Sequence, residues 1–372
     1  MKVGIDARFY RKETAGIGRY SRGLISSLAK IDQKNDYYIF LTAKDLKEYD
    51  IRAKNFHPVL TDITHYTLSE QTKFLSILKK YNFDLVHFLN FNHPIFYNRP
   101  FVTTVHDLTM LLFPVGRSQK SIIRKLAFKK VMSHAVKSAK RVITVSKSTK
   151  KDILKYIGGN AKNIQVVYEA FDDIYHNHYS QQEIKNTIKK YNLSDKYLLF
   201  VSQWRPHKGL PQLISAFEVL KKKYKIPHQL VITGKPNADF PEIIAKIKTS
   251  ANANEIITPG FVKEIDLPKL YADTSCFVFP SFYEGFGLGP LEAMACGAPI
   301  ASSNLSCMPE ILGQAPIYFN PANIQDLSDA IYKIISNQKL ANLLRQKGLK
   351  QAAKYSWQKM AQETLDIYKN SF

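Results

Sequence analysis

The sequence predicts an α/β protein built from two doubly wound domains, each with a parallel sheet. Its length of 372 residues fits two domains of ordinary size. Short runs of β-branched and aromatic residues alternate with longer stretches of helical periodicity, and this alternation occurs twice along the chain. Hydrophobic residues make up 45% and charged residues 23%, which is typical of globular proteins and excludes a disordered, collagen-like or low-complexity chain.

The first half of the chain contains one series of strand-like runs. These runs are Val3–Asp6, Tyr37–Thr42, Leu85–Asn90, Phe101–His106, Arg141–Ser146 and Ile164–Ala170. Between them, apolar residues recur at helical spacing, with one stripe formed by Ile17, Tyr20, Leu24 and Leu28 and another by Leu68, Phe74, Leu75 and Leu78. Continuous apolar strands that alternate with amphipathic helices indicate a parallel sheet covered on both faces.

The second half repeats the pattern after a polar segment at residues 171–191. Its strand-like runs are Tyr197–Ser202, Gln229–Gly234, Ile256–Val262, Cys276–Ser281, Pro299–Ser303 and Ile317–Phe319. We therefore expect a first domain over residues 1–172 and a second over 173–356. A last helix at about 357–372 is expected to pack back on the first domain. In doubly wound sheets ligands bind beyond the carboxyl ends of the strands, so chemistry is expected directly after each run.

The strongest local signal follows the strand-like run CFVFPS. It reads FYEGFGLGPLEAMACGAPIASS and places three glycines between a strand and a helical segment. Glycines there let the backbone approach a ligand closely. The helix that follows offers unpaired N–H groups to an anion, and we expect Phe286, Gly287 and Leu288 to supply them.

Two carboxylates, Glu284 and Glu292, flank this turn eight residues apart. Phosphate would repel a carboxylate, so these two are expected to face hydroxyl groups on either side of the bound anion. A nucleotide sugar has that layout, with ribose hydroxyls, a diphosphate and then sugar hydroxyls. The simpler alternative is that Glu284 caps the helix and Glu292 is a solvated helix residue.

This block resembles the E-x7-E signature of the retaining glycosyltransferases of family 4, which adopt the GT-B fold of two Rossmann-like domains facing a deep cleft. The resemblance continues in order through GIDARFYRKETAGIGRYSRGLISSLA, TTVHDLTMLLFP, RVITVSKSTKKDI, VSQWRPHKGLPQLISAF and SCMPEILGQAPIYFNP. Residues 44–80 and 171–190 match it poorly. It implies transfer of a sugar, mannose-like or another hexose, from a nucleotide diphosphate sugar to a hydroxyl acceptor, in cell-envelope polysaccharide or glycolipid synthesis.

The resemblance also implies roles for individual residues of the second domain. Glu284 would contact the donor sugar near its reacting end, and Glu292 would bind the donor ribose. Arg205 and Lys208 would bind the phosphates. This suits their chemistry, because an arginine forks onto diphosphate oxygens and a lysine adds a point charge where the leaving group becomes negative. The simpler alternative is that both belong to a generally basic surface.

Two departures from the family pattern occur in this domain. Many relatives carry a Gly-Arg pair where this chain has Gln203-Trp204, which makes the role of Lys208 more secure than that of Arg205. Many relatives also carry proline at the position of Gly289. The segment PGFVKE resembles the family's loop for the donor base, which would place Phe261 and Val262 there.

In the first domain the resemblance implies that His106, after the strand FVTTV, contacts the donor sugar and supports catalysis. A lone histidine is otherwise more often structural. Gly16, Gly18 and Arg19 would form a loop for the diphosphate or the acceptor at the first helix. The glycines fall short of the G-x-G-x-x-G pattern, so NAD binding is not supported.

We expect neither a metal nor another cofactor. The chain lacks an Asp-x-Asp triplet, which commonly holds a divalent ion on the donor diphosphate. Its three cysteines form no C-x-x-C pair, so a disulfide framework or a structural zinc site is not expected. We expect a reducing cytoplasmic location, because the N-terminal MKVGIDARFY lacks the apolar run of a signal peptide and no run reaches the length of a membrane span.

The formal net charge is +22, so the expected partners carry negative charge. Residues 117–162 hold fourteen of the basic residues and one acid, Asp152. Within them Ile123, Leu126, Val131 and Ala135 recur at roughly helical spacing. A basic amphipathic helix suits an anionic membrane surface at the inner face of the cell membrane, and the alternative is a core-packed helix with a solvated basic face.

The sequence is compatible with two other functions. One is a relative on the same fold that makes a soluble disaccharide or a glycosyl phosphate. The other is a non-catalytic protein that binds sugar nucleotides or polyanions. Nucleic-acid binding is not expected, because no helix-turn-helix, RNA-binding aromatic signature or zinc finger is present.

Overall fold

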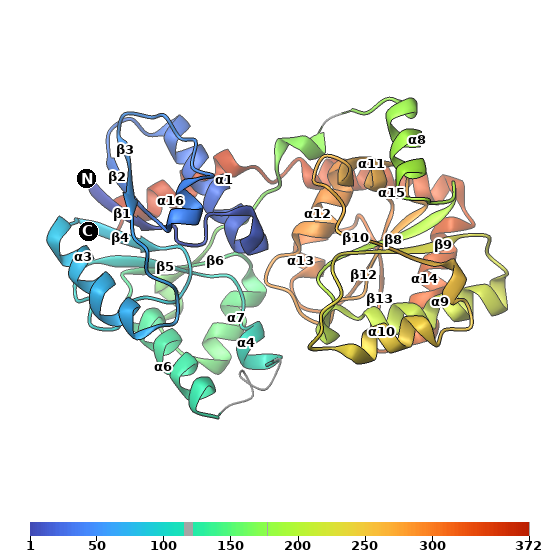
Figure 1. Ribbon diagram of the computed structural model, residues 1–372, viewed down its shortest axis with the longest axis horizontal. Coiled ribbons are helices and arrows are strands. Elements are labelled where there is room, and N and C mark those ends of the chain that lie inside the picture. The colour runs from blue at the N-terminus through green and yellow to red at the C-terminus, as the bar shows by residue number, and fades with distance from the viewer. Residues whose placement is uncertain (115–121, 177, 372) are drawn as a thin grey trace. The chain divides into compact units, whose positions relative to one another are not determined.

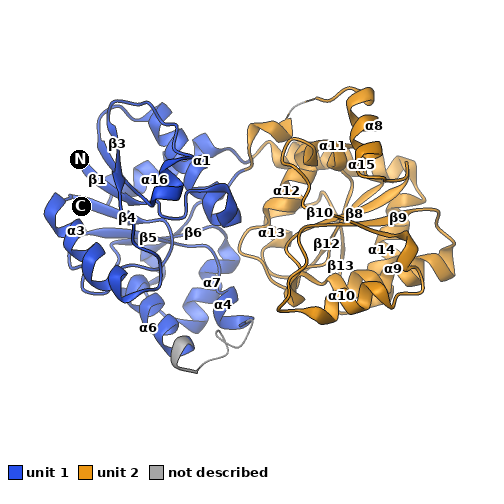
Figure 2. Ribbon diagram, viewed as in Figure 1, with its two compact units in different colours: residues 1–170, 355–372 blue, residues 171–354 orange. Residues whose placement is uncertain are grey.

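The computed structural model describes residues 1–114, 122–176 and 178–371. The chain divides into two compact units (Figure 2). Unit 1 comprises residues 1–170 and 355–372, and unit 2 comprises residues 171–354. Unit 1 therefore takes both ends of the chain, and unit 2 is one continuous segment.

Within the described residues, unit 1 holds a seven-stranded parallel sheet in the order β3-β2-β1-β4-β5-β6-β7. The strands are β1 Lys2–Asp6, β2 Asp36–Leu41, β3 Phe56–Leu60, β4 Leu85–Phe88, β5 Phe101–Val105, β6 Arg141–Thr144 and β7 Ile164–Val166. β1 and β4 are neighbours although β2 and β3 lie between them in sequence. The last strand, β7, is shorter than predicted. Val167 still donates to the carbonyl oxygen of Thr144 on β6, and residues 168–170 then leave the sheet.

Helices cover both faces of this sheet (Figure 1). α1 Ala15–Ile31 and α16 Trp357–Lys369 pack on one face, while α3 Leu75–Tyr81, α6 Ile122–Ser138 and α7 Lys147–Tyr156 pack on the other. The remaining elements are short: η1 Lys12–Thr14, α2 Ala43–Leu46, η2 Glu70–Phe74, α4 Thr109–Leu112 and η3 Ala161–Asn163. The stripe predicted to include Leu68 is wrong at that residue, which is 85% exposed before η2 begins.

The close contact between α1 and α16 depends on Gly23. A Cβ atom there would lie 2.4 Å from the Trp357 ring, so only glycine lets the two helices approach this far. Ser356 caps α16 by accepting a hydrogen bond from the backbone N–H of Lys359. Near the other end of α16, the Tyr368 hydroxyl lies 2.6 Å from the His87 ring on β4.

The part of unit 2 that the structure describes contains a six-stranded parallel sheet in the order β10-β9-β8-β11-β12-β13. The strands are β8 Tyr197–Val201, β9 Gln229–Thr233, β10 Ile256–Gly260, β11 Cys276–Phe279, β12 Ile300–Ser303 and β13 Ile317–Phe319. The predicted fold class, with two doubly wound parallel sheets, is confirmed.

The helices of unit 2 form two layers (Figure 1). One contains α9 Leu210–Tyr224, α10 Pro241–Lys248 and α14 Ile324–Ile335, and the other contains α8 Gln181–Lys190, α11 Leu267–Asp273, α12 Leu288–Ala295 and α15 Gln338–Ala352. Shorter elements are η4 Asp173–His176, η5 Pro206–Lys208, η6 Ala253–Glu255 and α13 Met308–Leu312. The segment at 171–191 that lacked strand character thus forms η4 and α8.

The amphipathic stripe predicted along α6 is wrong at Leu126. That side chain is 63% exposed, whereas Ala135 is buried as predicted and Val131 is half-buried. Residues 117–121 of the predicted basic segment, and the side chain of Ile123, lie outside the described residues. The core contacts of α6 come from its second half, where Met132 is also buried.

Candidate functional site

Two loops of unit 2 bring predicted donor residues together at the carboxyl edge of its sheet. The first follows β8 and turns through η5 into α9. Gly209 joins the two helices with φ of +71°, and a Cβ atom there would lie 2.1 Å from the carbonyl oxygen of Pro280. Glycine is therefore required at this turn, and it sets Lys208 against the loop that follows β11.

The departure at Gln203-Trp204 has a structural explanation. Trp204 is 3% exposed, and its indole N–H donates to the carbonyl oxygen of Thr233 at the end of β9. Arg205 follows this buried anchor, is half-buried, and its guanidinium makes no hydrogen bond or ion pair with the described residues. An arginine held by a buried neighbour but left unpaired is available to an anion.

Lys208 and Glu284 pair directly with one another. The Lys208 Nζ atom lies 2.7 Å from Oε1 and 2.8 Å from Oε2 of Glu284, and the two side chains are 17% and 12% exposed. The residue predicted to bind phosphate and the one predicted to bind the sugar thus neutralise each other. Between Arg205 and Lys208, burial and the two neighbouring cations lower the pKa of His207 to about 3, so this histidine adds no charge.

The segment after β12 holds the loop that carries Glu284. The Ser306 hydroxyl accepts from the backbone N–H of Glu284 at 3.2 Å and donates to its carbonyl oxygen at 2.7 Å. The buried Cys307 thiol lies 3.3 Å from that carbonyl oxygen and 3.2 Å from the one of Phe286. Sequence reasoning assigned no role to Ser306 or Cys307, although both lie in the quoted segment SCMPEILGQAPIYFNP.

The predicted anion-binding turn forms the start of α12. Gly287 precedes the helix with φ of +96°, and a Cβ atom there would lie 2.5 Å from the Met308 methyl carbon. Leu288 is the first residue of α12, so its N–H and the next ones lack a helical acceptor. Gly289, where many relatives carry proline, lies in the first turn with its nearest neighbouring atoms at ordinary contact distances of 3.7–3.9 Å.

Glu292 lies on the buried side of α12. It is 3% exposed, and the Tyr271 hydroxyl of α11 donates to its Oε2 atom at 3.3 Å. A buried carboxylate needs such a partner. The alternative that Glu292 is a solvated helix residue is therefore wrong, while its role as a ribose ligand stays a prediction.

The predicted base loop follows β10 at the outer edge of the same sheet. Phe261 is 69% exposed and Val262 is 7% exposed. The Lys235 ammonium lies 6.0 Å from the centre of the Phe261 ring, which is the outer limit of a cation–π contact. An exposed aromatic ring at a carboxyl strand end is available to stack on a flat ligand.

In unit 1, both ring nitrogens of His106 face acceptors. Nδ1 lies 3.0 Å from the Glu169 carboxylate and Nε2 lies 2.9 Å from the carbonyl oxygen of Leu89. Burial lowers the pKa of His106, but Glu169 and the Leu89 carbonyl raise it more, so the net shift is upward. This arrangement favours the imidazolium form. The ring can therefore donate a hydrogen bond to a sugar only if it gives up its bond to Glu169 or to the Leu89 carbonyl oxygen.

Gly16, Gly18 and Arg19 lie in the first turns of α1. Gly16 is exposed and Arg19 is half-buried, so both are accessible. Gly18 is buried, and a Cβ atom there would lie 2.3 Å from both the Arg11 carbonyl oxygen and the Thr14 hydroxyl. Gly18 thus lets η1 pack on the helix, and the ligand role predicted for this loop remains a prediction.

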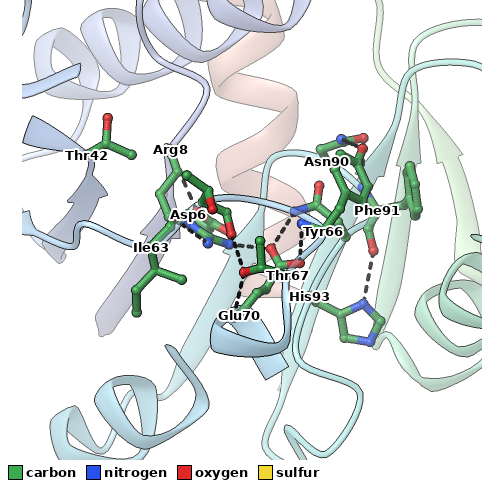
Figure 3. A network of polar contacts seen from close by, with 12 residues as sticks. Asp6, Arg8, Thr42, Ile63, Tyr66, Thr67, Glu70, Asn90, Phe91 and His93 are labelled. Atoms are coloured by element: carbon green, nitrogen blue, oxygen red, sulfur yellow. Dashed lines mark hydrogen bonds and ion pairs between the residues drawn. The ribbon is translucent and has the colours of Figure 1, made fainter. Parts of the chain in front are cut away.

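Sequence reasoning also missed a buried ion network in unit 1 (Figure 3). The Arg8 guanidinium lies 2.7 Å from Asp6 at the end of β1 and 2.7 Å from Glu70 at the start of η2. These three side chains are between 0% and 5% exposed. Asn92 donates to Glu70 at 2.8 Å. Glu70 falls within residues 44–80, where the family resemblance was poor, so no motif pointed to it.

Across the described residues, no cluster of three or more His, Cys, Asp or Glu side chains is arranged to hold a metal ion. In the same part of the chain, no helix combines the length and apolar character that crossing a membrane requires.

Two family models together match most of the chain. Residues 14–173 match Glycosyltransferase Family 4, and residues 180–351 match Glycosyl transferases group 1. The chain belongs to the GT-B glycosyltransferases. The predicted family is therefore confirmed, and the protein is a glycosyltransferase.

Among curated proteins, this glycosyltransferase is similar to the O-antigen chain mannosyltransferase B of Escherichia coli. The two are 28% identical over 384 residues, which span 99% of this chain and all of that protein. Among solved structures, sucrose-phosphate synthase from Thermosynechococcus elongatus superposes with a TM-score of 0.78 at 18% identity, covering 100% and 98% of the two chains. The Anabaena protein HepE, solved in complex with UDP-glucose, gives 0.77 at 18% identity with full coverage of both chains. These two structures show the GT-B fold.

Proposed function

We propose that this glycosyltransferase moves a mannose-like hexose from a nucleotide diphosphate sugar to a hydroxyl acceptor in the synthesis of a cell-envelope polysaccharide. The observation that carries the proposal is the group formed by Arg205, Lys208 and Glu284 beside the start of α12 in unit 2. The name of the Escherichia coli relative supports a mannosyl donor and an O-antigen product. The UDP-glucose complex of HepE supports a nucleotide sugar on this fold.

The proposed chemistry follows from the charges of unit 2. Departure of the nucleoside diphosphate places negative charge on the phosphate oxygens, and Arg205, Lys208 and the N-terminus of α12 stabilise that charge. These groups do the work that a divalent ion does elsewhere, so we propose that transfer needs no metal. The phosphates bind Lys208 and break its ion pair with Glu284. The Glu284 carboxylate then accepts hydrogen bonds from the donor sugar.

We further propose that transfer retains the anomeric configuration. We assign Glu284 to hydrogen bonds with the donor sugar, so it has no proposed role as a covalent nucleophile. A front-face route, in which the departing phosphate helps to deprotonate the acceptor hydroxyl, fits a site that offers cations and amides. A soluble disaccharide or glycosyl-phosphate synthase would use the same donor residues, and the acceptor distinguishes these alternatives.

Nucleotide binding tests the donor site. GDP, UDP and ADP are each added to the purified protein, with either magnesium or EDTA, and thermal unfolding is followed. A ligand at about 100 times its Kd adds roughly 2.7 kcal/mol of apparent stability. We expect one base to give a clear shift in EDTA. A shift that requires magnesium would contradict metal-independent binding, and no shift with any nucleotide would contradict the donor site.

We propose in addition that the basic face of α6 attracts an anionic membrane surface, where a lipid-linked acceptor would reside. Lys125, Lys129 and Lys130 are exposed, and the exposed Leu126 lies among them. Each lysine near an anionic surface contributes about 1 kcal/mol. We expect the protein to co-sediment with phosphatidylglycerol vesicles and not with phosphatidylcholine vesicles.

Glutamate at positions 125, 129 and 130 should abolish this vesicle binding. The control places glutamate at Lys333, Lys339 and Lys350, which are three exposed lysines of unit 2. Both triple variants change the net charge equally. A difference in vesicle binding between them would therefore come from the position of the lysines and not from the total charge. Equal loss of binding in both would show that the total charge, and not α6, attracts the vesicles.

A further inference from the structure

The ion network of unit 1 fixes both ends of one short segment, residues 63–66 (Figure 3). At its start, Nη1 of Arg8 donates to the carbonyl oxygen of Ile63 at 3.1 Å. At its end, the backbone N–H of Tyr66 donates to Oε2 of Glu70 at 3.0 Å. Because Arg8 also pairs with Glu70, a single buried ion pair holds both ends of the segment.

Burying these three charged side chains opposes folding. Burying charged side chains costs several kcal/mol per ion, which the pairing has to offset, so a buried ion network is weak evidence for a purely stabilising role. Glu70 begins a π-helical turn, η2, and such turns are frequent at functional sites. Tyr66 adopts φ of +60°, which is strained for an aromatic residue.

The segment presents aromatic rings in this fixed position. His65 stacks on Phe9 with ring centres 3.5 Å apart. Tyr66 is 53% exposed, and its hydroxyl accepts a hydrogen bond from the buried Asn90 side chain at 3.2 Å. The Tyr66 ring is thus oriented by one contact at its backbone and another at its hydroxyl, while about half of the residue's surface is accessible.

The rings lie where a doubly wound sheet binds ligands. Phe9 follows β1, residues 63–66 follow β3, and Asn90 and Asn92 follow β4, so all come from carboxyl ends of parallel strands. Asn92 is 2% exposed, and its Oδ1 atom has no hydrogen-bond partner among the described residues. A buried acceptor of this kind is satisfied by a hydroxyl donor or by water.

We propose that Tyr66 forms the floor of an acceptor subsite and stacks against the apolar face of a neutral pyranose ring. The network of Asp6, Arg8 and Glu70 would then be a positioning device that holds this ring. A sugar combines an apolar face with hydroxyl groups, which matches an exposed aromatic ring beside buried amide side chains. Two carboxylates and one guanidinium leave the network with a net charge of −1, which disfavours a phosphate.

The segment lies within residues 44–80, which contain none of the motifs by which the sequence resembles its family. The inference rests on the proposed function, because it names the acceptor of that same reaction as a sugar.

Saturation-transfer NMR with simple sugars tests the subsite. The probes are methyl glycosides of mannose, glucose, galactose, rhamnose and N-acetylglucosamine, added to the full chain. We expect at least one glycoside to be saturated by the wild type, and Tyr66→Ala to weaken its binding roughly tenfold. Tyr66→Phe keeps the stacking ring and should bind within a few-fold of the wild type.

Two variants separate binding from folding. Tyr66→Asn removes the ring, but asparagine tolerates a positive φ, so its melting temperature should equal or exceed that of the wild type while binding is lost. Tyr156→Ala is the matched control, because Tyr156 is a 36% exposed tyrosine at the end of α7, toward the opposite edge of the sheet. It should bind the glycoside normally.

Nucleotide binding is measured on the same samples. A wrong acceptor subsite can therefore be distinguished from a wrong donor site. Tyr66→Ala that binds the glycoside as well as the wild type would overturn the inference. Equal weakening in Tyr156→Ala, or a wild type that binds nucleotide but saturates none of the five glycosides, would also overturn it. A wild type that binds no nucleotide contradicts the proposed donor site instead.

Discussion

Replacing Glu284 with glutamine is expected to tighten the binding of a nucleoside diphosphate while it removes sugar transfer. In the free protein both oxygens of Glu284 hold the Lys208 ammonium, at 2.7 and 2.8 Å. The diphosphate has to take Lys208 away from this carboxylate and also approach its negative charge. Glutamine keeps the size of the side chain but abolishes the ion pair and the repulsion.

The magnitudes favour a measurable effect. Two unit charges 4 Å apart interact by about 4 kcal/mol at an effective dielectric constant of 20. Recovering one third of that gives about 1.4 kcal/mol, or a tenfold lower Kd. Transfer should fall by roughly 100-fold or more, since an interaction made to the reacting sugar is lost. Calorimetry with the nucleotide identified by thermal shift, and release of that nucleotide from its sugar, measure the two effects.

Glu242→Gln provides the matched control, because Glu242 is an exposed carboxylate in the first turn of α10. It should change neither quantity. Lys208→Ala should weaken nucleotide binding and transfer together. An unchanged nucleotide affinity in Glu284→Gln would mean that the phosphates leave the ion pair intact. Near-full transfer by that variant would show that Glu284 makes no important contact with the donor sugar.

Replacing Arg8 with methionine is expected to destabilise unit 1 by about 3–5 kcal/mol, because removing one partner leaves buried carboxylates unpaired. Asp6 and Glu70 would lose their shared cation at sites only 5% and 1% exposed. Urea unfolding of the purified variant measures the loss. Since native proteins are stable by only about 5–15 kcal/mol, this change should also lower the yield of folded protein.

A second substitution identifies the cause. Glu70→Gln in the Arg8→Met background removes one of the unpaired charges, so the double variant should be more stable than the sum of the two single changes predicts. Arg52→Met, at an exposed arginine of the same unit, is the control and should cost less than about 0.5 kcal/mol. A loss below about 1 kcal/mol in Arg8→Met would contradict the role of the network.

Features encoded by neighbouring residues could be predicted from the sequence. The apolar runs gave the buried parallel strands, and EGFGLG gave the turn at Gly287, because strand burial and a positive φ depend on local residue types. The position of Lys208 directly after a strand predicted its place at the carboxyl edge of the sheet. The predicted strand after Ile164 was too long, because β7 ends at Val166 and residues 168–170 no longer pair with the sheet.

Pairings between distant residues could not be predicted. Glu169 is 63 positions from His106, and Glu70 is 62 positions from Arg8. Neither pair shows in local periodicity, because a side chain's partner depends on how the strands are ordered in the sheet. The Lys208–Glu284 pair is of the same kind. Each residue had a separate predicted role, and only the fold shows that they neutralise one another.

Donor turnover in the presence of EDTA tests the central claim most directly. GDP-mannose and common UDP- and ADP-sugars are each incubated with the protein and a lipid-linked oligosaccharide extract, and the new linkage is examined by NMR. We predict that one donor is consumed without metal, that its sugar is transferred with retained anomeric configuration, and that Glu284→Ala does neither. Inverted configuration, or no consumption of any donor by a folded protein that binds the nucleotide, would contradict the account.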